Sequence, residues 1–172
     1  EKGATKKLFA ALWIEGRSVT WGEIAGFGTA VSAGAKAGDS DAASKMRVSV
    51  YTRSDSCGAA ETWAQYLGGR QEDLKGVAVY GDPGLAEAVR RDRFGVGYNN
   101  LNYAYDTKTG FPVEGILIFP VDVDENGKRD PVEDLSTKRK AIRAIQTGAY
   151  PSPPARDLYL VTKDGFRGLS ME

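Results

Sequence analysis

Short strand-like and helix-like segments alternate along most of this 172-residue chain. Residues 46–51 and 77–80 have the apolar pattern of strands, whereas residues 5–15, 59–67 and 82–90 have helical spacing bounded by cap residues, glycine or proline. Strands that alternate with helices are typical of α/β proteins, and the length suits one domain. We therefore expect a single α/β domain.

Several later segments extend this pattern. The nearly continuous apolar run 115–121 predicts a strand covered on both faces, and residues 95–98 and 158–162 predict two more strands. Residues 103–105 are expected to be extended, and the spacing of Leu135, Ile142 and Ile145 predicts a helix over 133–145. Residues 26–45 are rich in Gly, Ala, Ser and Asp and predict a surface loop.

The composition excludes several classes of function. Histidine is absent and Cys57 is the sole cysteine, which excludes His-dependent catalytic triads, His-ligated zinc and an intrachain disulfide. Catalytic mechanisms that need an imidazole base are therefore excluded. A nucleophilic Cys57 acting without a histidine base is the least favoured alternative.

The charge balance bears on possible partners. The 23 Lys and Arg residues balance 23 Asp and Glu residues, which leaves no electrostatic basis for binding nucleic acid or an anionic membrane. No apolar run approaches the roughly 18 residues that a membrane span needs. We expect neither a nucleic-acid partner nor insertion into a membrane.

An acidic loop over residues 122–133 matches the calcium-loop pattern D-x-[DN]-x-[DN]-G-x5-E at every specified position. Calcium prefers six to eight oxygen ligands, which alternate side chains of a curled loop can supply. The predicted ligands are Asp122, Asp124, Asn126, the carbonyl of Lys128, Asp130 and Glu133. Arg129 replaces the usual aliphatic residue, and a strand is expected before the loop, so we predict a structural calcium. A solvated acidic turn is the alternative.

The turn 53–59 joins a predicted strand to a predicted helix and has the residues of an anion site. Free amides at a helix start attract an anion, and an arginine fork fits an oxyanion. The candidate residues are Arg53, Ser54, Asp55, Ser56, Cys57, Gly58 and Ala59. Asp55 is expected to hold Arg53 in place. The alternative is an ordinary helix cap beside a surface arginine.

This turn resembles the Arg-x-Asp-x-Ser-Gly-Thr signature of the substrate-binding proteins of phosphate ABC transporters. Three other segments are similar to motifs of that family, in the same order along the chain. They are Leu8-Phe9 through Gly16 to Trp21, Gly81-Asp82-Pro83 through Val89 to Gly95-Val96-Gly97-Tyr98, and Tyr150-Pro151 through Leu158-Tyr159-Leu160-Val161. The resemblance covers most of the chain.

The resemblance implies a type II periplasmic binding-protein fold. This chain would be a three-layer α/β/α lobe with a mixed sheet, incomplete at both ends. Residues 1–172 would form one lobe, with about 1–150 as the second lobe and 151–172 returning toward the first. The family is exported, binds phosphate or a related oxyanion, and docks on an ABC permease when full length.

Only some of the residues in the family's signature are present in this turn. The family's Arg, Asp and Gly fall on Arg53, Asp55 and Gly58, whereas its Ser and Thr fall on Cys57 and Ala59. Both hydroxyl ligands are therefore replaced, so phosphate would lose two hydrogen bonds. With the resemblance, we expect an exported oxyanion-binding lobe of an ABC transporter that carries a structural calcium and is not an enzyme. The alternative is a calcium-stabilised extracellular adhesion or scaffold module that has lost anion binding.

Overall fold

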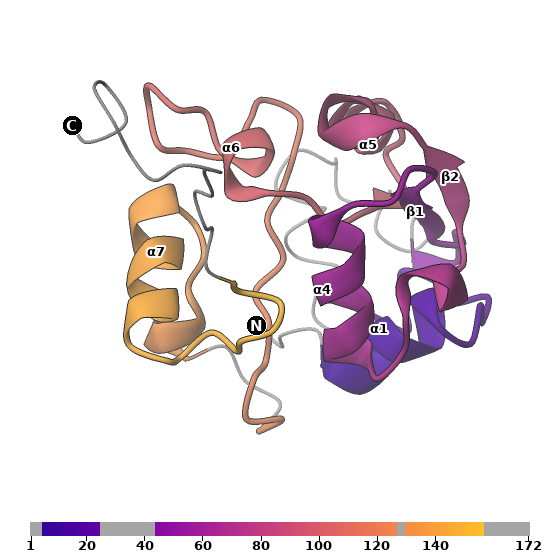
Figure 1. Cartoon of the computed structure of the whole chain (residues 1–172), viewed down its shortest axis with the longest axis horizontal. Helices are drawn as coiled ribbons and strands as arrows, with labels where there is room; N and C mark the ends of the chain where they lie inside the picture. The colour runs from indigo at the N-terminus through magenta and orange to yellow at the C-terminus, as the bar shows by residue number, and fades with distance from the viewer. Residues whose placement is uncertain (1–4, 25–43, 127–129, 157–172) are drawn as a thin grey trace, which may run out of the picture.

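The structure is a computed structural model that describes residues 5–24, 44–126 and 130–156. Within these ranges a small sheet lies among helices (Figure 1). In chain order the elements are α1 (Lys6–Trp13), β1 (Ser49–Arg53), α4 (Gly58–Leu67), η2 (Gln71–Asp73), β2 (Val77–Val79), α5 (Gly81–Arg91), β3 (Gly95–Val96), α6 (Leu101–Ala104), η3 (Pro131–Glu133) and α7 (Lys138–Gln146). Strands and helices alternate through the first part, which confirms the α/β class.

The sheet has three parallel strands in the order β2-β1-β3. Tyr51 of β1 pairs with Val77 of β2, and Val50 pairs with Val96 of β3. The expected mixed sheet is therefore wrong for the described residues. The physical reason is that α4 and α5 form the crossovers between successive strands, and a crossover through a helix returns the chain in a parallel direction.

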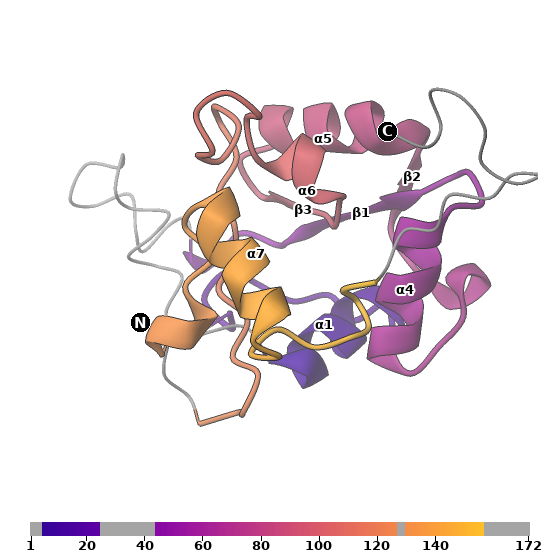
Figure 2. The ribbon, with the colours of Figure 1, turned by 60° about the vertical axis from the view of Figure 1, so that its left-hand side comes forward.

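Helices lie on both faces of this sheet. Figure 2 shows α5 on one face and α1 with α4 on the other. This follows from the strand order, because the chain leaves β1 toward β2 and then crosses back to β3. Two crossovers of the same hand that run in opposite directions place their helices on opposite faces.

The predicted helices have the expected end signals. The Thr5 hydroxyl accepts a hydrogen bond from the Leu8 amide (3.3 Å) at the start of α1, and Gly68 ends α4 in the left-handed conformation (φ 87°). Pro83 lies in the first turn of α5, where its missing N–H costs nothing. The helices predicted over 5–15, 59–67 and 82–90 are confirmed with small shifts at their ends.

The core is an aromatic cluster between α1, α4 and the sheet. Trp63 of α4 packs edge to face on Trp13 of α1 at 5.3 Å and stacks on Tyr98 at 5.8 Å. The Trp13 indole also donates to the Tyr51 carbonyl (3.1 Å), which joins α1 to β1. Aromatic pairs of this kind add to the free energy of burial and fix the relative positions of the elements.

Three predictions fail in the later part of the chain. Residues 103–105 are not a continuous extended piece, because Leu101–Ala104 form α6. Residues 115–121 form no named strand, and the helix predicted from 133 begins at Lys138, after the short turn η3. Most of the predicted loop 26–45 and the predicted strand 158–162 lie outside the described residues.

Candidate functional site

The turn 53–59 lies at the carboxyl end of the central strand β1. Because β2 and β3 lie on opposite sides of β1, the direction of the chain connections reverses at this end. Open α/β sheets bind ligands at such reversal points. The Tyr98 hydroxyl closes one side of the turn, since it pairs with the Thr52 hydroxyl (2.9 Å) and accepts from the Arg53 amide (3.2 Å).

Arg53 is held by two carboxylates. Its Nε and Nη2 donate to the two oxygens of Asp55 (2.9 and 2.5 Å), and Nη1 donates to Asp82 of α5. Its side chain is only 6% exposed. The hydrogen bond with Asp55 raises the pKa of the Arg53 guanidinium above its usual range, and the same contact holds the pKa of Asp55 well below its usual range.

This ion-pair network belongs to the start of α5. Asp55 also accepts a hydrogen bond from the amide of Gly81 (3.0 Å), the first residue of α5. Asp82 lies in the first turn of the same helix and accepts from the Asn100 side chain (2.9 Å). The predicted contact between Asp55 and Arg53 is therefore present, and its direct effect is to fasten the turn to α5.

The start of α4 is different. The Cys57 thiol caps the helix weakly, accepting from the Ala60 amide at 3.4 Å, while the Cys57 amide donates to the Gln71 side chain (3.0 Å). Within the described ranges, no residue accepts a hydrogen bond from the amides of Gly58 and Ala59. These two amides carry the partial positive charge of the helix N-terminus.

Other polar groups near this turn do not serve the two amides. Glu61 lies in the first turn of α4, but its carboxylate accepts from the Gln65 side chain (2.8 Å) and from the Gln71 amide (3.4 Å). Ser54 and Ser56 are exposed. The structure therefore divides the predicted site: Arg53 and Asp55 fasten the turn to α5, whereas Gly58 and Ala59 present amides at α4.

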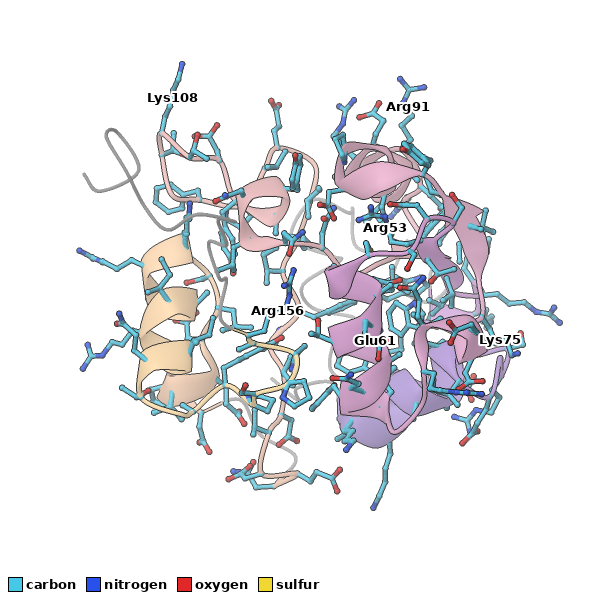
Figure 3. The ribbon with its side chains drawn as sticks, in the orientation of Figure 1. Arg53, Glu61, Lys75, Arg91, Lys108 and Arg156 are labelled. Atoms are coloured by element: carbon cyan, nitrogen blue, oxygen red, sulfur yellow. The ribbon has the colours of Figure 1, made fainter. Side chains whose placement is uncertain are left out.

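Arg156 lies over the first turn of α4. A β-carbon placed on Gly58 would come within 2.8 Å of both Cζ and Nη2 of Arg156, so the guanidinium occupies the space above this glycine. Figure 3 shows Arg156 beside α4 and Arg53 on the α5 side of the same turn. Arg156 is exposed, and no carboxylate pairs with it in the part of the chain that the structure describes.

Sequence reasoning missed Arg156 as a site residue. It lies far along the chain from Gly58, so spacing alone gives no sign of the contact. A signal was present, because Arg156 lies within the segment from Tyr150-Pro151 to Leu158-Tyr159-Leu160-Val161 that resembles a motif of the phosphate-transporter family.

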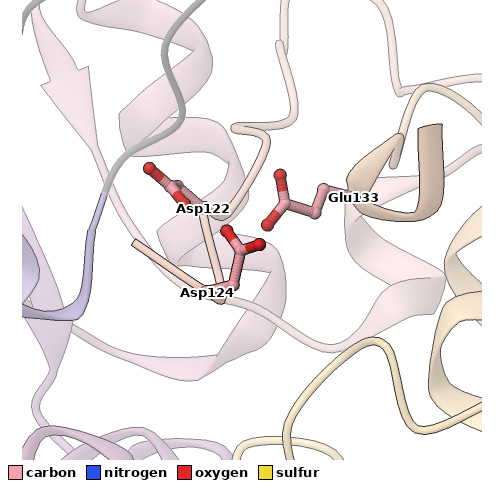
Figure 4. Close-up of side chains that lie close together, drawn as sticks. All are labelled: Asp122, Asp124 and Glu133. Atoms are coloured by element: carbon pink, nitrogen blue, oxygen red, sulfur yellow. The ribbon is translucent and has the colours of Figure 1, made fainter. Parts of the chain in front are cut away.

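The acidic loop brings three carboxylates together. One oxygen from each of Asp122, Asp124 and Glu133 lies within 4.8 Å of the others. Figure 4 shows the three side chains gathered together. Asp122 is 1% exposed and Glu133 is 5% exposed, so two of the three are buried. Carboxylates this close repel one another, and a bound cation removes that repulsion. This cluster can hold a metal ion.

The other predicted ligands do not belong to this group of three carboxylates. The Asn126 side-chain nitrogen donates to Asp124 (2.9 Å) and to Asp130 (2.7 Å), so these residues form a hydrogen-bonded rim beside the cluster. Glu133 accepts from the amides of Val123 (2.7 Å) and Asp130 (3.0 Å), which ties both ends of the loop together. Lys128 lies outside the described residues.

The metal-ligand atoms that the cluster offers are all carboxylate oxygens, which suit hard cations such as calcium and magnesium. Soft metals prefer sulfur and nitrogen, which the cluster does not offer. The chemistry of the three residues therefore fits a hard divalent cation.

No family model, curated protein or solved structure matches this chain at a significant level. Among the described helices, none has the length and apolar character needed to cross a bilayer.

Proposed function

We propose that this chain is the oxyanion-binding lobe of an exported, phosphate-type solute-binding protein, which binds its solute without catalysis and delivers it to an ABC permease when full length. The observation that carries the proposal is the position of the Arg156 guanidinium over Gly58, at the reversal point of the sheet. The resemblance of the turn 53–59 and of three further segments to that family supports the same function.

The electrostatics of this corner favour an anion. The N-terminus of α4 carries about half a positive charge, and Arg156 brings a full positive charge to the same place. Two positive groups at this distance repel each other, and an anion between them compensates both. A tetrahedral oxyanion can accept from the amides of Gly58 and Ala59 and from the arginine fork at once.

Arg53 has a supporting role in this proposal. Three of its N–H groups donate to Asp55 and Asp82, which fixes the turn that presents the two amides. The thiol of Cys57 and the methyl group of Ala59 stand where the family has hydroxyl groups. The anion is therefore bound mainly by the α4 amides and Arg156.

The experiment is a calorimetric titration of the chain with inorganic phosphate and with sulfate, repeated for Arg156→Gln. We expect saturable binding by the wild type and a loss of about tenfold or more in Arg156→Gln, because a charge-assisted hydrogen bond is removed. Arg91→Gln is the matched control, since Arg91 is equally cationic and lies at the far end of α5. Equal binding by Arg156→Gln and the wild type contradicts the assignment.

One observation favours the second candidate, a calcium-stabilised extracellular adhesion or scaffold module without anion binding. Arg53, the family's charged ligand, is neutralised by Asp55 and Asp82. Silence with every oxyanion at millimolar concentration, combined with stabilisation by calcium, supports this module and rejects the transport function.

We also propose that the acidic cluster binds a structural calcium ion. A ligand at about 100 times its Kd stabilises a protein by about 2.7 kcal/mol, which raises the Tm of a domain of this size by several degrees. Differential scanning calorimetry in millimolar calcium and in excess chelator measures the shift. Asp124→Asn is expected to abolish it and Glu114→Gln, an exposed control, to preserve it. An unchanged Tm in the wild type rejects calcium.

A further inference from the structure

A large cavity lies beside the proposed anion site. Its volume is about 1020 Å³, at the upper end of the range of small-molecule sites. Residues of α4, α5, α6 and α7 and of the segment 115–121 line it. Figure 2 shows where these helices lie. The lining is mainly apolar and includes Trp63, Tyr98, Tyr105, Phe119 and Tyr150.

Trp63 has a buried hydrogen-bond donor without an acceptor. Its side chain is 7% exposed, and its Nε1 has no hydrogen-bond partner within the described structure. The other two tryptophans differ, since Trp13 donates to the Tyr51 carbonyl (3.1 Å) and Trp21 donates to the Phe94 carbonyl (3.2 Å). Buried indole N–H groups normally have a partner. Trp63 forms part of the cavity wall but its Nε1 is itself buried, so what it offers a bound molecule is the aromatic surface of its ring.

The cavity opens directly onto the anion site. Ala59 and Arg156 line the cavity, and the same two residues flank the free amides at the start of α4. Ala59 presents a methyl group at this junction, so the passage from the anion site into the cavity is apolar. Inorganic phosphate would fill only a small part of the combined space.

We propose that the ligand is an organic oxyanion: a phosphate, phosphonate or carboxylate group carried on a planar, largely apolar body. This inference rests on the oxyanion-binding function proposed above and names the class of solute. The charged group binds Arg156 and the α4 amides, and the body enters the aromatic-lined cavity. The ring of Trp63 offers the body an aromatic surface.

Isothermal titration with inorganic phosphate and with 4-acetylphenyl phosphate tests the proposal. The second probe carries the same charged group, a planar ring and a carbonyl acceptor. We expect it to bind at least about tenfold more tightly than inorganic phosphate, because its ring leaves water for an apolar cavity. Arg156→Gln is expected to weaken both probes.

Two variants separate the cavity from the anion site. Ala86→Leu adds bulk at a residue of α5 that lines the cavity and takes no part in the anion site, so it should remove most of the advantage of the organic probe and change inorganic phosphate binding by less than about threefold. Trp63→Phe reduces the aromatic surface that this residue offers to the cavity, so it should weaken the organic probe alone, by severalfold.

The outcomes distinguish the two proposals. If inorganic phosphate binds as tightly as the organic probe, and both depend on Arg156, the organic class is wrong and the oxyanion function stands. If neither probe binds, both proposals are wrong. If the organic probe binds more tightly but its affinity is unchanged in Ala86→Leu and in Trp63→Phe, its body lies outside this cavity and the inference is overturned.

Discussion

The helices α4 and α5 both begin at the carboxyl edge of the sheet, yet the charged groups next to their first residues have opposite signs. At α5, Asp82 lies in the first turn and Asp55 accepts from the Gly81 amide, with Arg53 joining the two carboxylates. At α4, a thiol is the cap, the carboxylate of Glu61 in the first turn accepts from Gln65 and Gln71, and the Arg156 guanidinium lies over Gly58.

This difference between the two helix N-termini shows which arginine is available to a ligand. Carboxylates of the chain itself satisfy the positive end of α5, and they satisfy Arg53 at the same time. The positive end of α4 has gained a second positive charge instead. A protein can maintain such an arrangement at little cost only where the side chain stays exposed or an anion joins it.

The largest expected effect is on stability, and it concerns Arg53. Replacing it with methionine in Arg53→Met leaves Asp55 and Asp82 close together without their shared cation. Breaking a buried ion pair in this way is expected to cost about 3 kcal/mol of unfolding free energy. Urea denaturation followed by circular dichroism measures it. Arg156→Met is the matched control, with an expected change within about 0.5 kcal/mol. Equal costs in the two variants would erase the distinction between the arginines.

The second effect is on the pH dependence of stability. Arg53 holds the pKa of the Asp55 carboxyl below its usual value of about 3.9, so folding favours the ionised form. The resulting stability is complete above about pH 4 and is lost as the pH falls toward the lower pKa of the folded state. Melting temperatures are measured between pH 7 and pH 2.5. At neutral pH the wild type should melt at a higher temperature than Asp55→Asn, and the difference between the two melting temperatures should decrease in acid. A gap that stays constant over this range would contradict the role of Asp55.

The smallest expected effect concerns Gly58. In Gly58→Ala the added methyl group displaces the Arg156 guanidinium, while alanine improves the helix by up to about 1 kcal/mol. Oxyanion affinity should therefore fall by about three- to tenfold with stability unchanged or raised. Gly84→Ala, in α5, is the matched control and should leave the affinity unchanged. An undiminished affinity in Gly58→Ala would show that the anion does not need Arg156 in this position.

Much of the first part of the fold follows from local sequence signals. Trp63 and Leu67 lie on the buried face of α4, and Gly68 stops this helix, so periodicity and cap residues are sufficient there. The later part lacks such signals. The four residues of α6 are too few to show a period, and the apolar run 115–121 lines a cavity instead of pairing in the sheet, which leaves Leu117 68% exposed.

Only part of the candidate site could be predicted from the sequence. Arg53 and Asp55 are two residues apart and both lie in a recognisable turn, so their contact could be predicted. Whether Arg53 is free depended on Asp82, and the cation at α4 is Arg156; tertiary packing brings both to the turn. The acidic cluster shows the same limit, since the spacing predicted Asp122, Asp124 and Glu133 together, but not the hydrogen bond of Asn126 to Asp130.

The close approach of Arg156 to Gly58 also predicts how these two positions vary among related proteins. Gly58 lies in a right-handed helical turn, where any side chain is allowed by the backbone, so what a side chain there would disturb is the present position of the arginine head above it. In homologous chains the two positions should change together. Where arginine is lost at 156, residue 58 is released to become alanine or serine, and a lineage with that pair of changes will have abandoned or altered its solute.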